Sequence, residues 1–454
     1  MRPMQEPSFW LSRLGPRLAR PAVSADVDVD VCVLGAGYTG LWTAYYLAKA
    51  DPSVRVAVVE RERVGFGASG RNGGWASAKI AGIDRLLADP ATRPGAAATY
   101  REMIATLGEM ERVIAAEGID CGWTIGGSVV AATRPSQVER LEESVAAEHA
   151  AGFDDTDLRW MEPDEARRVI STSRLHGATF TPHCAAVDPA RLVAGLAEAA
   201  QRAGVTIYEQ TPGTPVPGGI RTAGGRVMAP VVVEAVEAYR TSLPGRRRDI
   251  IPVYSLMVVT EPLPATVWDE IGLARRETFS DGRHLIIYGQ RTDDDRIAFG
   301  GRGAPYHYRS AVEPGFDFDE GTSAFLRQTL VDLFPVLGGV RFEGAWGGPL
   351  AIARDWQPSI LFDGATAVVG GYVGQGVALA NLAGRTVRDL VLHRDTELVR
   401  LPWVGHRSRR WEPEPLRWVG VNLARRLTES LDRAEDAGRR PRIRQAIFDR
   451  LPVG

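Results

Sequence analysis

Glycines near the start of the chain are spaced as in a site for a dinucleotide. Gly35-Ala36-Gly37-Tyr38-Thr39-Gly40 has the pattern G-x-G-x-x-G, and Glu60 follows 20 residues after Gly40. The first glycine allows a tight turn, the second lets backbone N–H groups approach a pyrophosphate, and the third lets a helix pack closely on a strand. A carboxylate at Glu60 can accept hydrogen bonds from ribose hydroxyls. The alternative is a glycine turn in an unrelated α/β unit, with Glu60 at a solvated strand end.

The flanking residues predict the strands and the helix that would hold these groups in place. Residues 29–34 and 54–59 are rich in valine, as in buried parallel strands. Ala44 and Leu47 follow Gly40 by four and seven residues, so both lie on the helix face that would pack on the sheet. Because the motif occurs in this context, we predict a dinucleotide site rather than an isolated turn.

Two further glycine-rich stretches lie far apart in the chain. Residues 65–75, GFGASGRNGGW, suit no regular helix or strand, so we predict a loop that either wraps around a ligand or is flexible. Residues 364–384 carry no charge and could be mistaken for a membrane span. Their six glycines, together with Gln375 and Asn381, favour a strand, a loop and a helix instead.

The composition indicates a globular protein of more than one domain. The chain has 454 residues, of which 44% are hydrophobic and 24% are charged, and its net charge is −2. This balance argues against nucleic acid as a partner. Cys32, Cys121 and Cys184 form neither a metal pattern nor a disulfide framework, so we expect no metal site and a reducing, cytoplasmic location. The N-terminus contains arginines but lacks the apolar run of a secretory signal.

Helices and strands alternate in the first half of the chain, and the pattern changes near residue 250. Apolar residues at three- and four-residue steps predict helices over 92–118, 136–151 and 190–203. Short apolar runs predict strands over 123–131, 205–208 and 227–236, and we expect 205–208 to return to the first sheet. Later runs predict a separate antiparallel sheet over 253–259, 285–288 and 296–299, with a hairpin turn at 293–295.

The two ends of the chain lie outside these patterns. Residues 1–28 are predicted to be a leader that packs on the surface through Phe9 and Trp10. Near the other end, an apolar stripe on one predicted helix is formed by Leu416, Val419, Leu423, Leu427 and Leu431. We expect this helix to dock on the protein's own surface. A membrane-surface helix is the alternative, but it would need a cleaner basic face.

Five blocks, taken in order, carry a resemblance to a known family. They are GAGYTGLWTAYYLA, GFGASGRNGGW, HCAAVDPARLVAGLAEAA, GQRTDDDRIAFGGRGAPYHY and GGYVGQGVALANLAGR. With these blocks the chain resembles the D-amino-acid oxidase-like family of FAD-dependent amine oxidoreductases. Within that family it is most similar to the gamma-glutamylputrescine oxidase and glycine/sarcosine oxidase branch. The blocks lie between residues 31 and about 390, which is most of the chain.

The resemblance implies an α/β fold, α+β overall, in which a Rossmann-like FAD-binding domain is interleaved with an antiparallel-sheet substrate domain. The FAD-binding domain would comprise residues 29–90, 176–245 and 345–395. The substrate domain would comprise residues 91–175 and 246–344. Residues 396–454 would form a C-terminal helical tail.

The resemblance also implies which residues contact FAD. The pyrophosphate would meet Gly35, Gly37, Tyr38, Thr39 and Gly40, and the adenosine end would meet Glu60 and Arg61. The pyrophosphate, ribityl chain and isoalloxazine ring would lie along Gly67, Ala68, Ser69, Arg71, Asn72, Gly73 and Gly74. The pyrimidine edge of the flavin would lie against Gly371, Gly374, Gln375, Gly376 and Val377. A helix that begins at this edge would stabilise the negative charge of reduced flavin.

The chain departs from the family pattern in several places, one of which is the segment of residues 211–220, shorter and richer in Gly and Pro than expected. Ala235-Val236-Glu237 stands where relatives often have Ala-Thr-Glu. Sarcosine oxidases attach flavin through a cysteine in the second half of the chain, but no cysteine follows Cys184, so we expect non-covalent FAD. They also use a lysine over the flavin to activate oxygen, and the strand around residues 284–288 has none. Lys79 follows the flavin loop and could substitute, or it could be a surface lysine.

The implied reaction is oxidation of a C–N bond in an amine or amino acid. A hydride would pass from the α-carbon to flavin N5, the imine would hydrolyse, and molecular oxygen would accept the electrons and give hydrogen peroxide. The candidates for contact with the substrate are Trp75, His183, Tyr254, His284, Tyr288 and Arg302. Each also has a structural explanation, and His183 in particular is expected to stabilise a loop.

Three alternatives to an oxidase stay open, as does the oligomeric state. One is a flavin dehydrogenase that uses another acceptor, one is a non-catalytic flavoprotein subunit, and one is a tailoring enzyme of a biosynthetic pathway.

Overall fold

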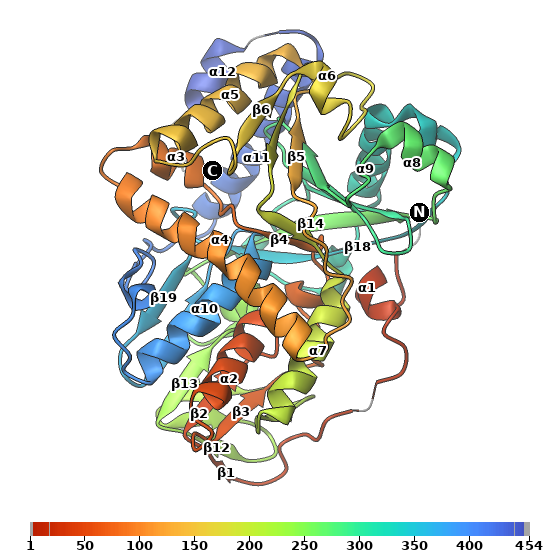
Figure 1. The fold of residues 1–454 in the computed structure, drawn as a ribbon. Helices are drawn as coiled ribbons and strands as arrows, with labels where there is room; N and C mark the ends of the chain where they lie inside the picture. Colours follow the sequence, from red (N-terminus) through yellow and green to blue (C-terminus); the bar gives the residue numbers. More distant parts are fainter. Residues whose placement is uncertain (1–2, 18, 440, 449–454) are drawn as a thin grey trace.

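A six-stranded sheet forms the lower half of the computed structural model, which describes residues 3–17, 19–439 and 441–448 (Figure 1). Its order is β19-β20-β13-β2-β3-β9, and neighbouring strands are parallel except at β19. The strands are β2 (Val31–Leu34), β3 (Val56–Val59), β9 (Thr206–Tyr208), β13 (Val231–Glu234), β19 (Ser359–Phe362) and β20 (Thr366–Gly370). Both faces of β2 and β3 are buried, because their residues are apolar at every position. The predicted strand–helix–strand unit is confirmed.

Four helices are part of the hydrophobic core of this sheet. They are α2 (Tyr38–Ala50), α4 (Arg93–Ala116), α7 (Pro189–Arg202) and α10 (Gly376–Val391). Ala44 and Leu47 of α2 are fully buried, as their spacing predicts. The predicted start of α7 is also confirmed, since the Asp188 carboxylate accepts hydrogen bonds from the first backbone N–H groups of the helix.

An eight-stranded sheet, mostly antiparallel, forms the upper half. Its order is β18-β14-β17-β16-β15-β5-β7-β6. The strands are β5 (Ser128–Ala131), β6 (Arg159–Met161), β7 (Ala178–Thr181), β14 (Ile251–Thr260), β15 (Thr278–Asp281), β16 (Ile287–Arg291), β17 (Ile297–Arg302) and β18 (Phe342–Ile352). Its helices are α5 (Pro135–Ala150), α6 (Pro163–Ala166), α8 (Ala265–Ile271) and α9 (Glu320–Leu333). The predicted antiparallel sheet and its hairpin turn at residues 293–295 are confirmed.

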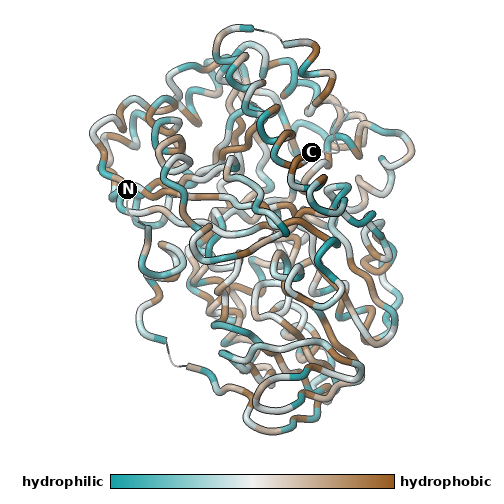
Figure 2. Tube along the Cα trace, turned by 180° about the vertical axis from the view of Figure 1, so that it is seen from behind, coloured by the Kyte–Doolittle hydropathy of each residue, from teal (hydrophilic) through white to brown (hydrophobic). Residues whose placement is uncertain are grey.

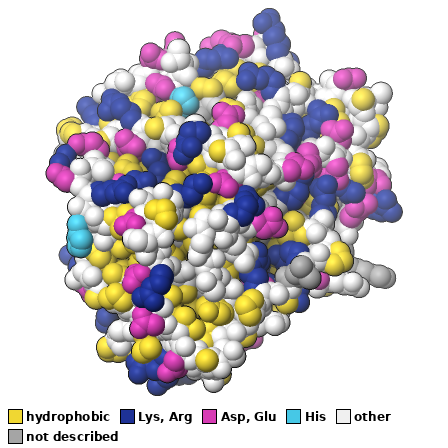
Figure 3. All heavy atoms as spheres, turned by 60° about the horizontal axis from the view of Figure 1, so that its bottom comes forward, with side chains coloured by type: hydrophobic (Ala, Val, Ile, Leu, Met, Phe, Trp, Pro, Cys, Tyr) yellow, Lys and Arg dark blue, Asp and Glu magenta, His cyan; other side chains and the backbone are white. Residues whose placement is uncertain are grey.

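Two small sheets complete the strands. One has the order β1-β12-β11-β10 and contains β1 (Val27–Asp28), β10 (Thr214–Val216), β11 (Gly219–Arg221) and β12 (Arg226–Met228). The other pairs β4 (Trp75–Ser77) with β8 (Cys184–Ala186). Seen from behind, hydrophobic stretches run along the inner strands while the outer helices are mixed (Figure 2). Acidic and basic side chains are interspersed on the face shown in Figure 3, in keeping with the near-zero net charge.

Several predicted boundaries differ from the observed ones. The strand predicted over 227–236 is two strands, β12 and β13, in different sheets, because the chain turns at Ala229-Pro230. The strand predicted from residue 123 begins only at Ser128, after a loop that contains Gly126 and Gly127. The predicted domain boundary at residue 345 falls inside β18, and α4 shares its core with the six-stranded sheet, so the division into domains stays a prediction.

The two ends of the chain are attached to the body. Trp10 lies in the short helix α1 (Phe9–Ser12), is 1% exposed and packs on Trp346, so the expected anchoring of the leader is confirmed. The tail forms α11 (Leu416–Asp436) and α12 (Arg442–Phe448) beside α5. The predicted helix is present, but only Leu431 of its apolar stripe is fully buried; Leu416, Val419 and Leu423 are exposed. Within the described residues, no helix is long and apolar enough to cross a membrane.

Candidate functional site

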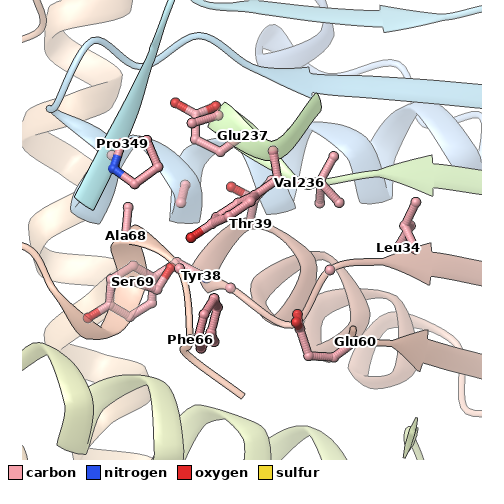
Figure 4. A pocket seen from close by; sticks show the side chains of 18 of the residues that line it. Leu34, Tyr38, Thr39, Glu60, Phe66, Ala68, Ser69, Val236, Glu237 and Pro349 are labelled. Carbon is pink, nitrogen blue, oxygen red and sulfur yellow. Dashed lines mark hydrogen bonds between the residues drawn. The ribbon is translucent and has the colours of Figure 1, made fainter. Parts of the chain in front are cut away.

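An elongated cavity lies where β2, β3 and β13 end, at the carboxyl edge of the six-stranded sheet (Figure 4). Ligands of open α/β sheets bind at such an edge. The predicted cofactor residues that line this cavity are Gly35, Gly37, Tyr38, Thr39, Glu60, Arg61, Gly67, Ala68, Ser69, Asn72, Gly374, Gly376 and Val377. Three separate stretches of the chain are therefore brought together as the resemblance implies. We call this space the first cavity.

The glycine motif has the close contacts that its residue types require. Gly35 has a φ of +105°, and a Cβ there would lie 2.7 Å from the carbonyl oxygen of Ala235. A Cβ on Gly40 would lie 2.0 Å from the carbonyl oxygen of Gly35, so Gly40 packs the helix on the strand and does not line the cavity. Gly37 precedes α2 without a side-chain cap, which leaves the positive end of the helix facing the cavity.

Glu60 stands at the end of β3, beside the glycine turn. Its carboxylate accepts hydrogen bonds from the backbone N–H of Ala36 at 2.7 Å and from that of Glu62 at 2.9 Å. Burial raises the pKa of Glu60, and the two backbone donors oppose this shift. The half-buried carboxylate is thus held beside the glycine turn, where it lines the first cavity.

The loop of residues 65–75 is ordered by contacts from both sides. Ser69 Oγ accepts a hydrogen bond from the backbone N–H of Tyr38 at 2.9 Å. From the N-terminal segment, Ser8 Oγ donates to the carbonyl of Gly70 at 2.6 Å, and Trp10 Nε1 donates to the carbonyl of Asn72 at 2.9 Å. The loop therefore wraps along the cavity rather than moving freely, and the leader supports it.

Three predicted cofactor residues of this loop, Arg71, Gly73 and Gly74, do not line the first cavity and contact the second sheet instead. Arg71 is 4% exposed, pairs with Asp317 and donates from Nη1 to the carbonyl of Gly347 in β18 at 3.3 Å, so it ties the loop to the eight-stranded sheet. A Cβ on Gly73 would lie 2.6 Å from Tyr288, and one on Gly74 would lie 2.0 Å from Gln290. The absent side chains of Gly73 and Gly74 let the second sheet approach the loop.

The start of α10 also lines the first cavity. Gln375 is its N-cap residue and offers no side-chain cap, and Gly374 has a φ of +94°. Gly371 does not line the cavity, but its backbone N–H donates to Glu237 at 2.9 Å. Glu237 also accepts from the backbone N–H of Tyr372 at 3.1 Å, and burial raises its pKa.

Sequence reasoning missed a set of lining residues in segments that follow the strands of the six-stranded sheet. The most prominent are Phe66, Pro212, Val236, Glu237, Tyr239 and Tyr372. Tyr239 stacks under the guanidinium of Arg61 at 5.2 Å, and Tyr372 OH hydrogen-bonds with Thr39 Oγ1 at 2.8 Å. Glu237 was noticeable only as part of the departing Ala235–Glu237 segment, and Tyr372 only as a residue within the uncharged stretch.

A second cavity of about 410 Å³ adjoins the first. Strands β14, β17 and β18 contribute Ile251, Val253, Arg302 and Ile352 to its lining, and the tail helix α11 contributes another side. A Cβ on Gly374 would lie 3.5 Å from Arg302 Nη2, so Arg302 stands at the junction of the two cavities.

Arg302 differs from the other cations of the second cavity. Arg354 pairs with Glu412, Arg417 with Glu414 and Arg425 with Glu429, and His284 contacts Asp432. Among the described arginines that line this cavity, Arg302 alone has no carboxylate within ion-pair distance. It donates to the carbonyl of Val373 at 2.6 Å and lies 5.4 Å from the ring of Trp356. Burial lowers its pKa to about 10, so it stays charged at neutral pH.

The other predicted substrate residues are divided among different places. The ring centroids of Trp75 and Tyr288 lie 6.2 Å apart, at the end of the loop of residues 65–75. Tyr288 OH hydrogen-bonds with Ser255 Oγ at 2.8 Å. His183 bonds to Asp157 at 2.8 Å, and Tyr254 is fully buried; neither is among the described residues that line the two cavities.

Two further candidates are held by acidic residues. His284 lines the second cavity, but its ring is held by Asp432 at 3.1 Å. Lys79 is neither a free surface lysine nor a lining residue of the described cavities, since its Nζ pairs with Glu148 at 2.6 Å and with Asp84 at 3.4 Å.

Comparison with known proteins identifies the family. The family described as FAD dependent oxidoreductase matches residues 30–390. The chain belongs to this family. The Haemophilus influenzae protein named "Probable oxidoreductase OrdL" is 28% identical over 411 residues, which cover 86% of this chain and 89% of that protein. The Escherichia coli gamma-glutamylputrescine oxidoreductase is 29% identical over 378 residues, which cover 81% of this chain and 85% of that protein.

A solved structure shows the same fold as this FAD-dependent oxidoreductase. Glycine oxidase from Geobacillus kaustophilus aligns with a TM-score of 0.69 at 23% identity, covering 84% of this chain and 99% of that structure. The predicted fold class and the predicted FAD are thereby confirmed.

The first cavity suits FAD both by its position at the sheet edge and by the hydrogen-bond donors that face it. Two helices, α2 and α10, direct their N-termini at it, and neither carries a side-chain cap, so both can face an anionic group. The Glu60 carboxylate lies at the β3 end for ribose hydroxyls. The cysteines Cys32, Cys121 and Cys184 are free, buried and not among the described lining residues.

Proposed function

We propose that the chain oxidises the C–N bond of an amine or amino acid that carries a carboxylate, with that carboxylate bound by Arg302 in the second cavity. The observation that carries this proposal is the charge of Arg302, which lacks an acidic partner among the described residues and lies beside Gly374. A buried guanidinium gains most from a bidentate carboxylate, because both groups are then hydrogen-bonded and neutralised. The relatives named for gamma-glutamylputrescine and for glycine support an amine or amino acid as the substrate class.

The residues of the chain then divide the work. Bound FAD supplies the acceptor of a hydride. Arg302 would orient the substrate so that its α-carbon faces the junction of the cavities, and Trp75 with Tyr288 would bound the space next to the flavin loop. A neutral amine loses a hydride from its α-carbon and a proton from nitrogen to give an imine. Water then hydrolyses the imine to a carbonyl compound and a smaller amine.

We propose molecular oxygen as the final acceptor, reduced by two electrons and two protons to hydrogen peroxide. The candidate lysine for oxygen activation, Lys79, is engaged with Glu148 and Asp84, and this favours a second candidate, a dehydrogenase that uses another acceptor. Comparing the steady-state rate with oxygen and with an artificial acceptor separates the two. A peroxide yield equal to the product yield supports an oxidase, and turnover only with the artificial acceptor supports a dehydrogenase.

Arg302→Met and Arg302→Lys test the binding role directly. We expect the methionine variant to raise the KM for acidic amines by roughly 100-fold, because a charge-assisted bidentate contact is lost. The lysine variant should recover part of the loss, and neutral amines should be affected less than tenfold, about 1.4 kcal/mol. An unchanged KM for acidic substrates in Arg302→Met would remove Arg302 from this role. The free cysteines support a reducing compartment, and we propose the cytoplasm.

A further inference from the structure

Helix α11 lies outside the part of the chain that matches the family, yet it lines the second cavity. Its lining residues recur at three- and four-residue steps, so one face of the helix is turned to the cavity. They are Leu416, Arg417, Gly420, Val421, Ala424, Arg425 and Thr428. Val419 and Leu423 lie outside this lining face; they are exposed to solvent, as are Leu416 and Gly420 within it.

Hydrogen bonds to the segments around Arg302 hold α11 in this position. The Asn422 side chain both donates to the carbonyl of Tyr306 at 3.1 Å and accepts from its backbone N–H at 3.2 Å. The Asp432 carboxylate accepts from the backbone N–H groups of His284 and Leu285, each at 2.8 Å. Both contacts fix the helix to the chain on either side of β16 and β17, so α11 is a built part of the cavity.

Apart from Arg302, the cavity offers a ligand mainly apolar surface. Strands β14 and β18 present Ile251, Val253 and Ile352, and two tryptophans, Trp356 and Trp411, line it as well. The remaining arginines of the lining are already paired with glutamates. A ligand that satisfies this space has one carboxylate and a sizeable apolar group.

Small residues of α11 leave the room for that group. Gly420 lies in the helix interior, where glycine is less favourable than alanine. A Cβ at Gly420 would meet no atom within 4 Å, so no packing contact requires the glycine. Ala424 follows one turn later on the same lining face. A larger side chain at either position would take up space in the cavity. At Gly420 its Cβ would displace no neighbouring atom.

We propose that α11 is the specificity wall of this enzyme, and that Gly420 and Ala424 admit substrates whose carboxylate carries a bulky apolar or aromatic group. The inference rests on the proposed function for the identity of the substrate as an amine, but the ligand preference itself does not require turnover. Gly420 and Ala424 are specificity-determining residues because they set the space available beyond Arg302.

Calorimetric titration of the FAD-loaded protein with phenylacetate and with acetate tests this wall without catalysis. We expect wild type to bind phenylacetate at least about tenfold more tightly, since the phenyl ring would bury its surface in the apolar space. Gly420→Phe and Ala424→Phe should each weaken phenylacetate by about tenfold or more and leave acetate within about twofold. Leu423→Phe, outside the lining face of α11, is the matched control and should change neither.

Arg302→Met should weaken both carboxylates together, which separates the anion site from the wall. Equal affinity of wild type for the two ligands would overturn the inference, as would filled variants that bind phenylacetate normally. Melting curves show whether each phenylalanine variant is folded, and Gly420→Leu provides a second, smaller filling of the same space.

Kinetics distinguish a failure of this inference from a failure of the proposed function. With N-methylphenylalanine and N-methylglycine as substrates, Ala424→Phe should raise the KM of the larger one about tenfold and leave the smaller one within about twofold. Selective phenylacetate binding without flavin reduction by any amine would contradict the proposed function while supporting the wall. Flavin reduction by amines with no size effect in the filled variants would support the function and overturn the wall.

Discussion

The first and second cavities differ in what lines them. The first is built around backbone features, namely glycine turns, strand ends and the N-termini of α2 and α10, with side chains such as Tyr239 and Tyr372 beside them. The second is formed by side chains from strands far apart in the sequence and from the tail helix. A backbone site imposes glycine at fixed positions, whereas a side-chain site can accept many residue types. A cofactor shared by a family suits the first kind of site, and a variable substrate suits the second.

The glycine turn that supports the first cavity tolerates little change at Gly40. A Cβ there would meet the carbonyl oxygen of Gly35 at 2.0 Å and Val33 at 3.0 Å, so Gly40→Val must displace backbone. We expect stability to fall by about 3 kcal/mol or more and bound FAD to be lost. Flavin absorbance per mole of protein and a urea titration measure both effects.

The control for this variant is Gly108→Ala in α4. A Cβ at Gly108 would meet no atom within 4 Å, so we expect full FAD content and a gain of up to about 1 kcal/mol. A Gly40→Val protein that retains FAD would show that the close contact of strand and helix is not required.

Lys79 lines neither the first nor the second cavity, so its replacement should affect stability without affecting either site. Lys79→Met leaves the buried carboxylate of Glu148, which is 0% exposed, without its cation, and we expect a loss of about 3 kcal/mol. The double variant with Glu148→Gln should recover much of it. The rate of flavin reoxidation by oxygen should stay within about twofold of wild type. A fall of that rate by orders of magnitude would place Lys79 at the flavin after all.

The same pair predicts a pH dependence. Burial lowers the pKa of Lys79, but the charges of Asp84 and Glu148 outweigh it and hold the pKa above its ordinary value of 10.5. A raised pKa of a cation contributes stability that is fully present below 10.5 and is lost as pH rises through the higher value. The stability gap between wild type and Lys79→Met should therefore shrink in strong alkali, as the lysine of the wild type loses its charge.

Replacing Glu60 tests what a side chain of the first cavity contributes to FAD binding. Glu60→Gln removes the charge that accepts bonds from Ala36 and Glu62 and that would meet the ribose. We expect FAD affinity to fall by roughly 30-fold, about 2 kcal/mol, because hydrogen bonds to charged groups are worth that much. Fluorescence quenching on FAD titration gives the affinity, and an unchanged value would exclude the ribose contact.

The smallest effect is expected at the anchor of the tail. Asp432→Asn weakens the contacts to His284 and Leu285, so α11 should open more often. We expect amide exchange in α11 to rise by about tenfold, about 1.4 kcal/mol, while β2 and FAD content stay unchanged. Equal acceleration in both elements would mean that the tail and the flavin domain open together.

The sequence predicted the first cavity well for a physical reason. Gly35, Gly37 and Glu60 act through local geometry within one strand–turn–helix–strand unit, and such geometry leaves a local pattern. The pattern does not say in which direction a long side chain points. Arg71 lies in a glycine-rich loop as a phosphate ligand would, yet Asp317, 246 residues away, and the carbonyl of Gly347 in β18 hold it against the other sheet.

The second cavity could be predicted only in fragments. Arg302 was a candidate because of its type, but its lack of an acidic partner depends on where every nearby carboxylate lies. The lining face of α11 carries Gly420 and Ala424, which each stand one residue after a member of the apolar stripe that the sequence displays. That stripe suggested a buried face, and Leu416 and Leu423 are 65% and 64% exposed instead. The exposure and the partners of each of these residues depend on packing between segments that are distant in the sequence.

Anaerobic titration of the FAD-loaded protein with a panel of amines and amino acids tests the central claim most directly. We predict that the flavin absorbance is bleached by an amine that carries a carboxylate and an apolar group, and that it returns when an acceptor is admitted. A protein that takes up FAD but is bleached by no member of the panel would contradict the proposed oxidation of a C–N bond.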